Sequence, residues 1–126
     1  MVDFPKGHDW LNSRELSFRR ELLNKIVIVH FWTSCCINCL HTLPDMEYLE
    51  CKFQANKAVV CVGCHSGKFH NEKSSHIVRQ AVIKYNVGHP VINDDKLQVW
   101  DMFGITCWPS IVVIGPYGFP ILTLTG

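Results

Sequence analysis

The chain has 126 residues, of which 48% are hydrophobic and 18% charged, and its formal net charge is +1. This length and composition predict one folded domain with its own hydrophobic core, and they argue against disorder. The basic residues are scattered, which argues against a nucleic-acid or membrane surface. The N-terminal stretch has no apolar region typical of a signal peptide, and no apolar run reaches the roughly 20 residues of a membrane helix.

Cysteine is unusually frequent, with seven residues, an odd number. Because no signal peptide is predicted, we do not expect a secreted scaffold held together by disulfides. We expect thiols that are reduced, reactive or metal-bound, in a cytosolic protein.

Apolar runs and helical patterns alternate along most of the chain. Residues 1–9 are predicted to be an irregular lead-in and residues 10–126 a single domain. The predicted strands are Glu15–Phe18, Ile26–Trp32, Ala58–Val62, Ser110–Ile114 and Phe119–Thr125, with an extended pair at Val91–Ile92. The predicted helices are Cys36–Phe53, Glu72–Tyr85 and Lys96–Phe103, preceded by one helical turn at Arg19–Leu23. Asp94 and Asp95 are expected to cap the last helix, and Gly63–Asn71 to form a polar loop.

The order of these elements predicts a fold class. Strands that alternate with helices in the first half require parallel pairing through right-handed crossovers. The last two strands are predicted to form a hairpin, which adds antiparallel strands at one edge. The sequence therefore predicts an α/β domain with a central mixed sheet and helices on both faces.

The most informative stretch joins the Ile26–Trp32 strand to the helix that follows it. Cys36 and Cys39 stand at the start of that helix, in a C-x-x-C pattern. A thiol at a helix N-terminus meets unpaired N–H groups and the positive end of the helix dipole, which favours a thiolate. Cys39 lies one turn along the same face, within reach of a disulfide bond. The pattern predicts thiol–disulfide exchange in which Cys36 attacks and Cys39 resolves; the alternative is a pair of buried, unreactive cysteines.

The string FWTSCCINC, followed by Pro44, resembles the thioredoxin signature. The longer pattern, WLN at Trp10–Asn12 and then KIVIVHFWTSCCINCLHTLPDMEYLE, resembles the thioredoxin-like domain of the NHL-repeat-containing protein family. This resemblance runs from about Trp10 to the last residue. It implies a thioredoxin-like three-layer sandwich. It also implies a further helix after the last strand and a β-propeller domain, neither of which the sequence contains, so we expect the chain to be incomplete at its C-terminus and to derive from a longer parent protein.

The resemblance also places residues around the cysteine pair. Pro109 is expected to follow a cis peptide bond and to turn the backbone of Trp108 toward the pair, where it offers hydrogen bonds to an extended substrate. Phe31 and Trp32 would complete an apolar platform. Cys107, two residues before the proline, is either within reach of the pair or a buried structural cysteine.

Two residues beside the pair depart from the family pattern. His30 stands where the family carries a buried acid, which accepts a proton when the resolving thiol attacks. A histidine can accept that proton, although burial lowers its basicity, or it can be a core residue without function. Cys35 replaces the aromatic residue that usually precedes the first cysteine, and it is either an apolar filler or a second redox thiol.

Cys61 and Cys64 form a second C-x-x-C and supply a rival hypothesis. The four cysteines have a spacing close to that of a four-cysteine zinc site, with His41 and His65 as reserve ligands. The position of Cys61 inside an apolar strand argues against zinc. We therefore expect these two cysteines to be additional thiols and the site to need neither metal nor organic cofactor.

The function predicted from the sequence is exchange with a disulfide on a protein or small molecule, in either redox direction. A non-catalytic interaction module of a larger protein is the alternative, which the histidine at position 30 and the missing helix favour. Other polar residues are expected to be ordinary solvated surface: His8, Lys68, His70, Glu72, Lys73, His76 and His89.

Overall fold

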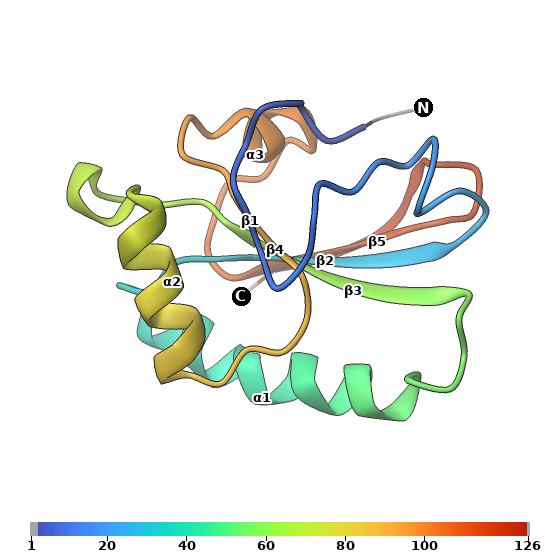
Figure 1. The fold of residues 1–126 in the computed structure, drawn as a ribbon, viewed down its shortest axis with the longest axis horizontal. Coiled ribbons are helices and arrows are strands. Elements are labelled where there is room, and N and C mark those ends of the chain that lie inside the picture. Colours follow the sequence, from blue (N-terminus) through green and yellow to red (C-terminus); the bar gives the residue numbers. More distant parts are fainter. Residues whose placement is uncertain (1–2, 126) are drawn as a thin grey trace.

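The computed structural model describes residues 3–125, so the predicted lead-in at Met1 and Val2 and the last residue, Gly126, lie outside the described residues. Figure 1 shows the arrangement of the elements. In chain order they are β1 (Trp10–Leu11), β2 (Ile26–Trp32), α1 (Ile37–Lys52), β3 (Val59–His65), the short 3-10 helix η1 (His70–Glu72), α2 (Ser75–Lys84), β4 (Val91–Asn93), α3 (Gln98–Met102), β5 (Ser110–Ile114) and β6 (Pro120–Thr125).

Six strands form one mixed sheet in the order β1-β4-β3-β2-β5-β6. β2 pairs with β3 in parallel and β3 with β4 in parallel, whereas β1, β5 and β6 pair antiparallel with their neighbours. Figure 1 shows α1 and α2 on one face of the sheet and α3 with the N-terminal segment on the other. The predicted α/β layout with helices on both faces is confirmed.

β2 is the centre of the sheet and is buried on both faces. Val29 and Phe31 belong to a core that α3 and the N-terminal segment complete, whereas Trp32 packs with residues of α1 and α2. Successive side chains of a strand point to opposite faces, so a central strand in a three-layer fold is expected to be mostly apolar on both faces. This requirement explains why the sequence predicted Ile26–Trp32 with correct ends.

The N-terminal region differs from its prediction. No strand forms over Glu15–Phe18: residues 15–17 are irregular and a series of turns follows. The carboxylate of Asp3 accepts the hydroxyl hydrogen of Ser17 at 2.8 Å and the N–H of Phe18 at 2.9 Å, so these polar groups are satisfied without a strand partner. The strand in this region is β1, which the sequence did not predict and which pairs only with β4.

β3 is longer than predicted, because Gly63 and the two residues after it continue the strand. The N–H of Gly63 donates to the carbonyl oxygen of Pro90 at 2.8 Å. A Cβ at position 63 would lie 3.1 Å from His89 Nε2 and 3.2 Å from Trp32 Nε1. The glycine is therefore required by close packing rather than by a turn, and the prediction of a loop from residue 63 was wrong.

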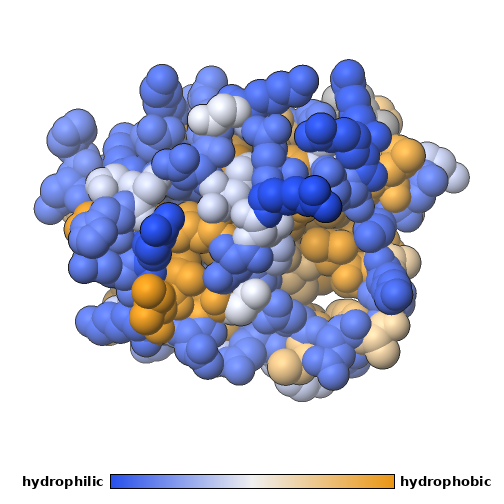
Figure 2. All heavy atoms as spheres, in the orientation of Figure 1, coloured by the Kyte–Doolittle hydropathy of each residue, from blue (hydrophilic) through white to orange (hydrophobic). Residues whose placement is uncertain are grey.

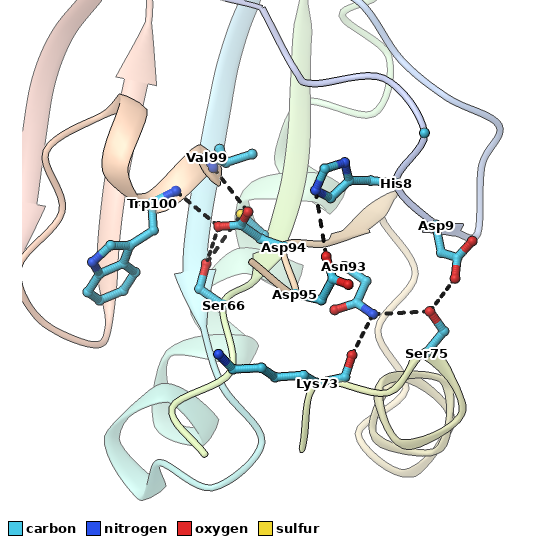
Figure 3. A network of polar contacts seen from close by, with 12 residues as sticks. His8, Asp9, Ser66, Lys73, Ser75, Asn93, Asp94, Asp95, Val99 and Trp100 are labelled. Atoms are coloured by element: carbon cyan, nitrogen blue, oxygen red, sulfur yellow. Dashed lines mark hydrogen bonds and ion pairs between the residues drawn. The ribbon is translucent and has the colours of Figure 1, made fainter. Parts of the chain in front are cut away.

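A polar network closes the sheet end where β3 and β4 finish (Figure 3). The carboxylate of Asp94 accepts the N–H groups of Val99 and Trp100 and the hydroxyl of Ser66, each at 3.0 Å. Asp94 thus caps α3 as predicted, but the helix begins at Gln98 because Leu97 has the left-handed φ of 56°. α2 also begins later than predicted, at Ser75.

Hydrophilic side chains cover most of the face shown in Figure 2, with apolar surface between them. Every residue of β6 is exposed, including Ile121, Leu122 and Leu124. Among residues 3–125, no helix has the length and apolar character needed to cross a membrane.

Candidate active site

Cys36 and Cys39 lie where β2 leads into α1. Cys36 is the N-cap residue, with extended backbone, and its Sγ accepts the backbone N–H of Cys39 at 3.4 Å. Cys36 is half-buried and Cys39 fully buried. The two thiols therefore differ in the way an exchange pair requires, because one is open to a substrate and the other is covered.

Burial also changes the acid–base properties of Cys39. It raises the pKa of Cys39 to about 12, and the hydrogen bond to Cys36 adds to the rise. At neutral pH Cys39 is accordingly a protonated thiol, which must lose its proton before it can act as a nucleophile.

The loop before Cys36 is held by the segment after β3. The N–H of Ser34 donates to His65 Nε2 at 3.2 Å, and the N–H of Ser66 donates to the carbonyl oxygen of Trp32 at 2.9 Å. Burial lowers the pKa of His65 to about 4, so the ring is neutral and accepts through Nε2. His65 was expected only as a reserve zinc ligand; its observed contact is with the loop that carries the cysteines.

An apolar platform surrounds the pair. Trp32 and Cys39 belong to one core cluster, against which Cys36 and Trp108 pack. The indole N–H of Trp108 donates to the carbonyl oxygen of Ser66 at 2.8 Å, and the Trp108–Pro109 peptide bond is cis. The structure therefore brings the side chains of β2, α1 and the segment before β5 to one end of the sheet.

Cys35 is exposed next to Cys36. Its sulfur does not occupy the N-cap position, and burial together with the charge of Glu72 raises its pKa. Both features make the Cys35 thiol a weaker nucleophile than a thiol at the N-cap.

His30 lies on β2 and is fully buried. Neither ring nitrogen has a hydrogen-bond partner among the described residues, and the ring stacks on Trp32 with centroids 6.4 Å apart. Burial, with a smaller contribution from His89, lowers the pKa of His30 to about 3. A ring this weakly basic is a poor proton acceptor at neutral pH.

The second cysteine pair does not join the first. Cys61 packs with Ile28 and Met46 on the face covered by α1, whereas Cys64 lies in the core on the opposite face. Two residues three positions apart in a strand point to opposite sides, so Cys61 and Cys64 cannot bind one metal ion. The zinc hypothesis is therefore wrong for this arrangement, and residues 3–125 hold no cluster of three or more metal-binding side chains.

Cys107 is half-buried, and its Sγ lies 3.9 Å from the hydroxyl of Ser110. No hydrogen bond or disulfide joins it to the Cys36–Cys39 pair within the described residues.

Two polar residues expected at the surface are buried. His89 is 3% exposed, with Nδ1 3.9 Å from a carboxylate oxygen of Glu50, and burial lowers its pKa to about 4. Glu72 is 2% exposed. His89 contacts a helix far away in the chain, whereas Glu72 contacts its own segment, where it accepts the N–H of Phe69.

The family model and the curated relatives that match this chain are as follows. A family model described as thioredoxin-like matches residues 24–119. The chain is 48% identical over 124 residues to Protein SUPPRESSOR OF QUENCHING 1, chloroplastic, from Arabidopsis thaliana, and 42% identical over 125 residues to NHL repeat-containing protein 2 from Bos taurus. Each alignment covers 98% of this chain, which spans only 12% and 17% of the two relatives.

The solution structure of a thioredoxin-like protein in the oxidized form has the same fold. It superposes with a TM-score of 0.81 at 20% identity, over 93% of this chain and 77% of that chain.

Proposed function

This chain belongs to the thioredoxin-like family, and on that basis we propose that it exchanges thiols and disulfides through Cys36 and Cys39. The Cys36 thiolate attacks a substrate disulfide, forms a mixed disulfide and releases one substrate thiolate, which takes a proton from solvent. Deprotonated Cys39 then attacks Cys36 Sγ and releases the second substrate sulfur. The substrate disulfide is reduced and the cysteine pair is oxidised, and the reverse sequence oxidises a dithiol.

The observation that carries this proposal is the hydrogen bond that the Cys39 N–H donates to Cys36 Sγ. The backbone N–H of Cys39 points at Cys36 Sγ from the first turn of α1, where further N–H groups have no partner within the helix. This arrangement supports negative charge on the half-buried sulfur while Cys39 stays protonated and covered. No organic cofactor takes part in these steps.

The Cys39→Ser variant tests the order of the two steps. Treated with oxidised glutathione, it is expected to retain glutathione on Cys36, because the resolving thiol of Cys39 is absent. The wild type is expected to pass on to a Cys36–Cys39 bridge. Peptide mapping after acid quenching distinguishes the two products. Glutathione found on exposed Cys51 but absent from Cys36 would contradict the proposal.

A second function is favoured by one observation. His30 is a weak base in the place of the family's buried acid, and this suits a module that binds partners without exchange. In that case the trapping experiment gives no glutathione on Cys36.

The partners proposed for the exchange reaction carry a disulfide on a protein or a small molecule. Because the chain spans a small part of its relatives, we also propose that it works beside other domains of a longer protein, a β-propeller among them. The cytosolic location stays a prediction.

A further inference from the structure

Lys68 is an exposed residue of the segment after β3, and its ammonium group lies over two aromatic rings. Its Nζ is 5.8 Å from the ring centroid of Trp108 and 5.7 Å from that of Phe69. A cation at this distance is attracted by the negative face of an aromatic ring. Because two rings contribute, they hold the otherwise flexible lysine side chain beside Trp108, which packs against the core cluster of Cys39.

Strand pairing places Trp108 beside the loop that carries Cys36. β2 and β5 pair antiparallel as far as Phe31 and Ser110. The chain just before Ser110, which holds Trp108, therefore lies alongside the chain just after Phe31. The N–H of Cys36 donates to the carbonyl oxygen of Thr33 at 3.3 Å, so Cys36 is one tight turn from the end of β2. Trp108 and Cys36 thus border the same end of the sheet.

Ser66 joins the segment that carries Lys68 to this same place. Its N–H donates to the carbonyl oxygen of Trp32 at 2.9 Å, and its own carbonyl oxygen accepts the indole N–H of Trp108 at 2.8 Å. Lys68 follows closely after Ser66 in the chain. Its ammonium group therefore lies at the rim of the candidate site, where it meets the part of a substrate that extends beyond the reacting sulfur.

Little other charge surrounds the cysteine pair. Three segments meet there, namely residues 33–39, 66–74 and 105–109. Their Lys, Arg, Asp and Glu residues are Lys68, Glu72 and Lys73. Lys68 is exposed, Lys73 half-buried and Glu72 buried. The exposed charge at this rim is thus positive.

The carboxylates next to these segments are bonded inside the protein. Glu72 Oε2 accepts the N–H of Phe69 at 2.8 Å. Asp94 is fully buried and accepts the N–H groups of Val99 and Trp100, each at 3.0 Å (Figure 3). Within residues 3–125 no carboxylate forms an ion pair with Lys68, so its charge is available to a substrate.

We propose that Lys68 selects anionic disulfides for the Cys36–Cys39 pair, by attracting a carboxylate of the substrate while the substrate sulfur lies against Cys36. This inference rests on the proposed exchange function. The substrate class is a disulfide that carries carboxylates near its sulfurs, as oxidised glutathione does. The bonds that form and break are those of the exchange reaction, and Lys68 itself neither gains nor loses a proton. A charge at the rim of a site acts chiefly on the rate of association, which is where we expect its effect.

The Lys68→Met variant tests the proposal, because methionine keeps an unbranched side chain that can still cover the two rings. Reduced protein is mixed with an anionic disulfide (oxidised glutathione), a neutral one (2-hydroxyethyl disulfide) or a cationic one (cystamine). Acid quenching and peptide mapping then give the rate at which Cys36 leaves the reduced form. Relative to the wild type at low salt, we expect the variant to react at least about threefold more slowly with oxidised glutathione. The rate with the neutral disulfide should be unchanged, and the rate with cystamine should rise.

Lys52→Met is the matched control. Lys52 is also an exposed lysine over two rings, with Nζ 5.9 Å from the centroids of both Tyr48 and Phe53, but it lies at the last turn of α1, away from Cys36. Its replacement should leave all three rates unchanged. In the wild type, about 1 M salt should remove most of the advantage that Lys68 gives to oxidised glutathione, because salt screens exposed charges.

The three disulfides separate attraction of the substrate from other roles of Lys68. Equal slowing with all three would mean that the lysine acts on the Cys36 thiolate or on the fold, and it would overturn the proposal. Unchanged rates in Lys68→Met would overturn it as well. Either result leaves the exchange function intact, whereas a wild type that forms no mixed disulfide on Cys36 with any of the three overturns both.

Discussion

Lowering the pH from 7 to 5 should destabilise the folded protein by several kcal/mol. Burial lowers the pKa values of three histidines, to about 3 for His30 and about 4 for His65 and His89. In the unfolded chain these side chains take up protons near pH 6.5. Between pH 6.5 and 4 the unfolded state therefore binds more protons than the folded state, so stability is complete above pH 6.5 and is lost as the pH falls.

The size of this effect follows from proton linkage. Each buried histidine contributes about 1.4 kcal/mol per pH unit, so three of them contribute about 4 kcal/mol per pH unit. Glu50, which lies 3.9 Å from His89, can pair with the protonated ring and reduce its share. Because single domains are stable by only about 5–15 kcal/mol, acid unfolding is expected near pH 5.

Urea unfolding at pH 7, 6 and 5.5 measures this prediction directly. Replacing His30 with leucine should remove about one third of the pH dependence of the free energy of unfolding. His76→Gln changes an exposed histidine and should leave the pH dependence unaltered. A wild-type protein whose stability is constant from pH 7 to 5.5 would show that the three rings are not buried as neutral groups.

Replacing Cys36 with serine should abolish exchange. The hydroxyl of serine remains protonated at neutral pH and does not attack sulfur, so the rate of insulin disulfide reduction by dithiothreitol should fall to the uncatalysed level, roughly 1,000-fold or more below the wild type. The substitution is nearly isosteric at a half-buried position, so the thermal midpoint should change little.

Cys51→Ser is the matched control for this loss. Cys51 is an exposed thiol near the opposite end of α1, and its removal should leave the rate unchanged. Substantial exchange by Cys36→Ser would assign the attack to another cysteine, and Cys35→Ser in the same background would show whether the adjacent thiol supplies it.

The sequence correctly predicted the elements that have a clear apolar pattern within their own residues. β2 and β5 have the predicted ends because each is a short, nearly continuous apolar run, and α1 lies within the predicted helix because its apolar residues recur at helical spacing. β1 was missed, since two residues carry no period and the strand depends on a partner about 80 residues away. β3 was cut short because Gly63 resembles a turn residue in sequence, whereas its neighbours in space require it.

In the candidate site, too, the sequence predicted residues that are close together in the chain and missed those that the fold brings together. Cys36 and Cys39 lie in one helical turn, so their spacing alone predicted that they would be close. His65 and His89 make contacts across the fold that the sequence did not predict, His65 with the N–H of Ser34 and His89 with Glu50. Glu72 was expected to be solvated, but it is buried. Their burial follows from strand pairing and from the close approach at glycine positions, which a single sequence does not reveal.

The most direct test of the exchange function is a redox titration of the whole chain in glutathione buffers, with peptide mapping at each potential. We predict that one bridge, between Cys36 and Cys39, forms and breaks reversibly as a two-electron couple, and that no metal is bound in the reduced form. Thiols at positions 36 and 39 that stay free under the most oxidising buffer, or zinc retained by the reduced protein, would contradict the exchange function.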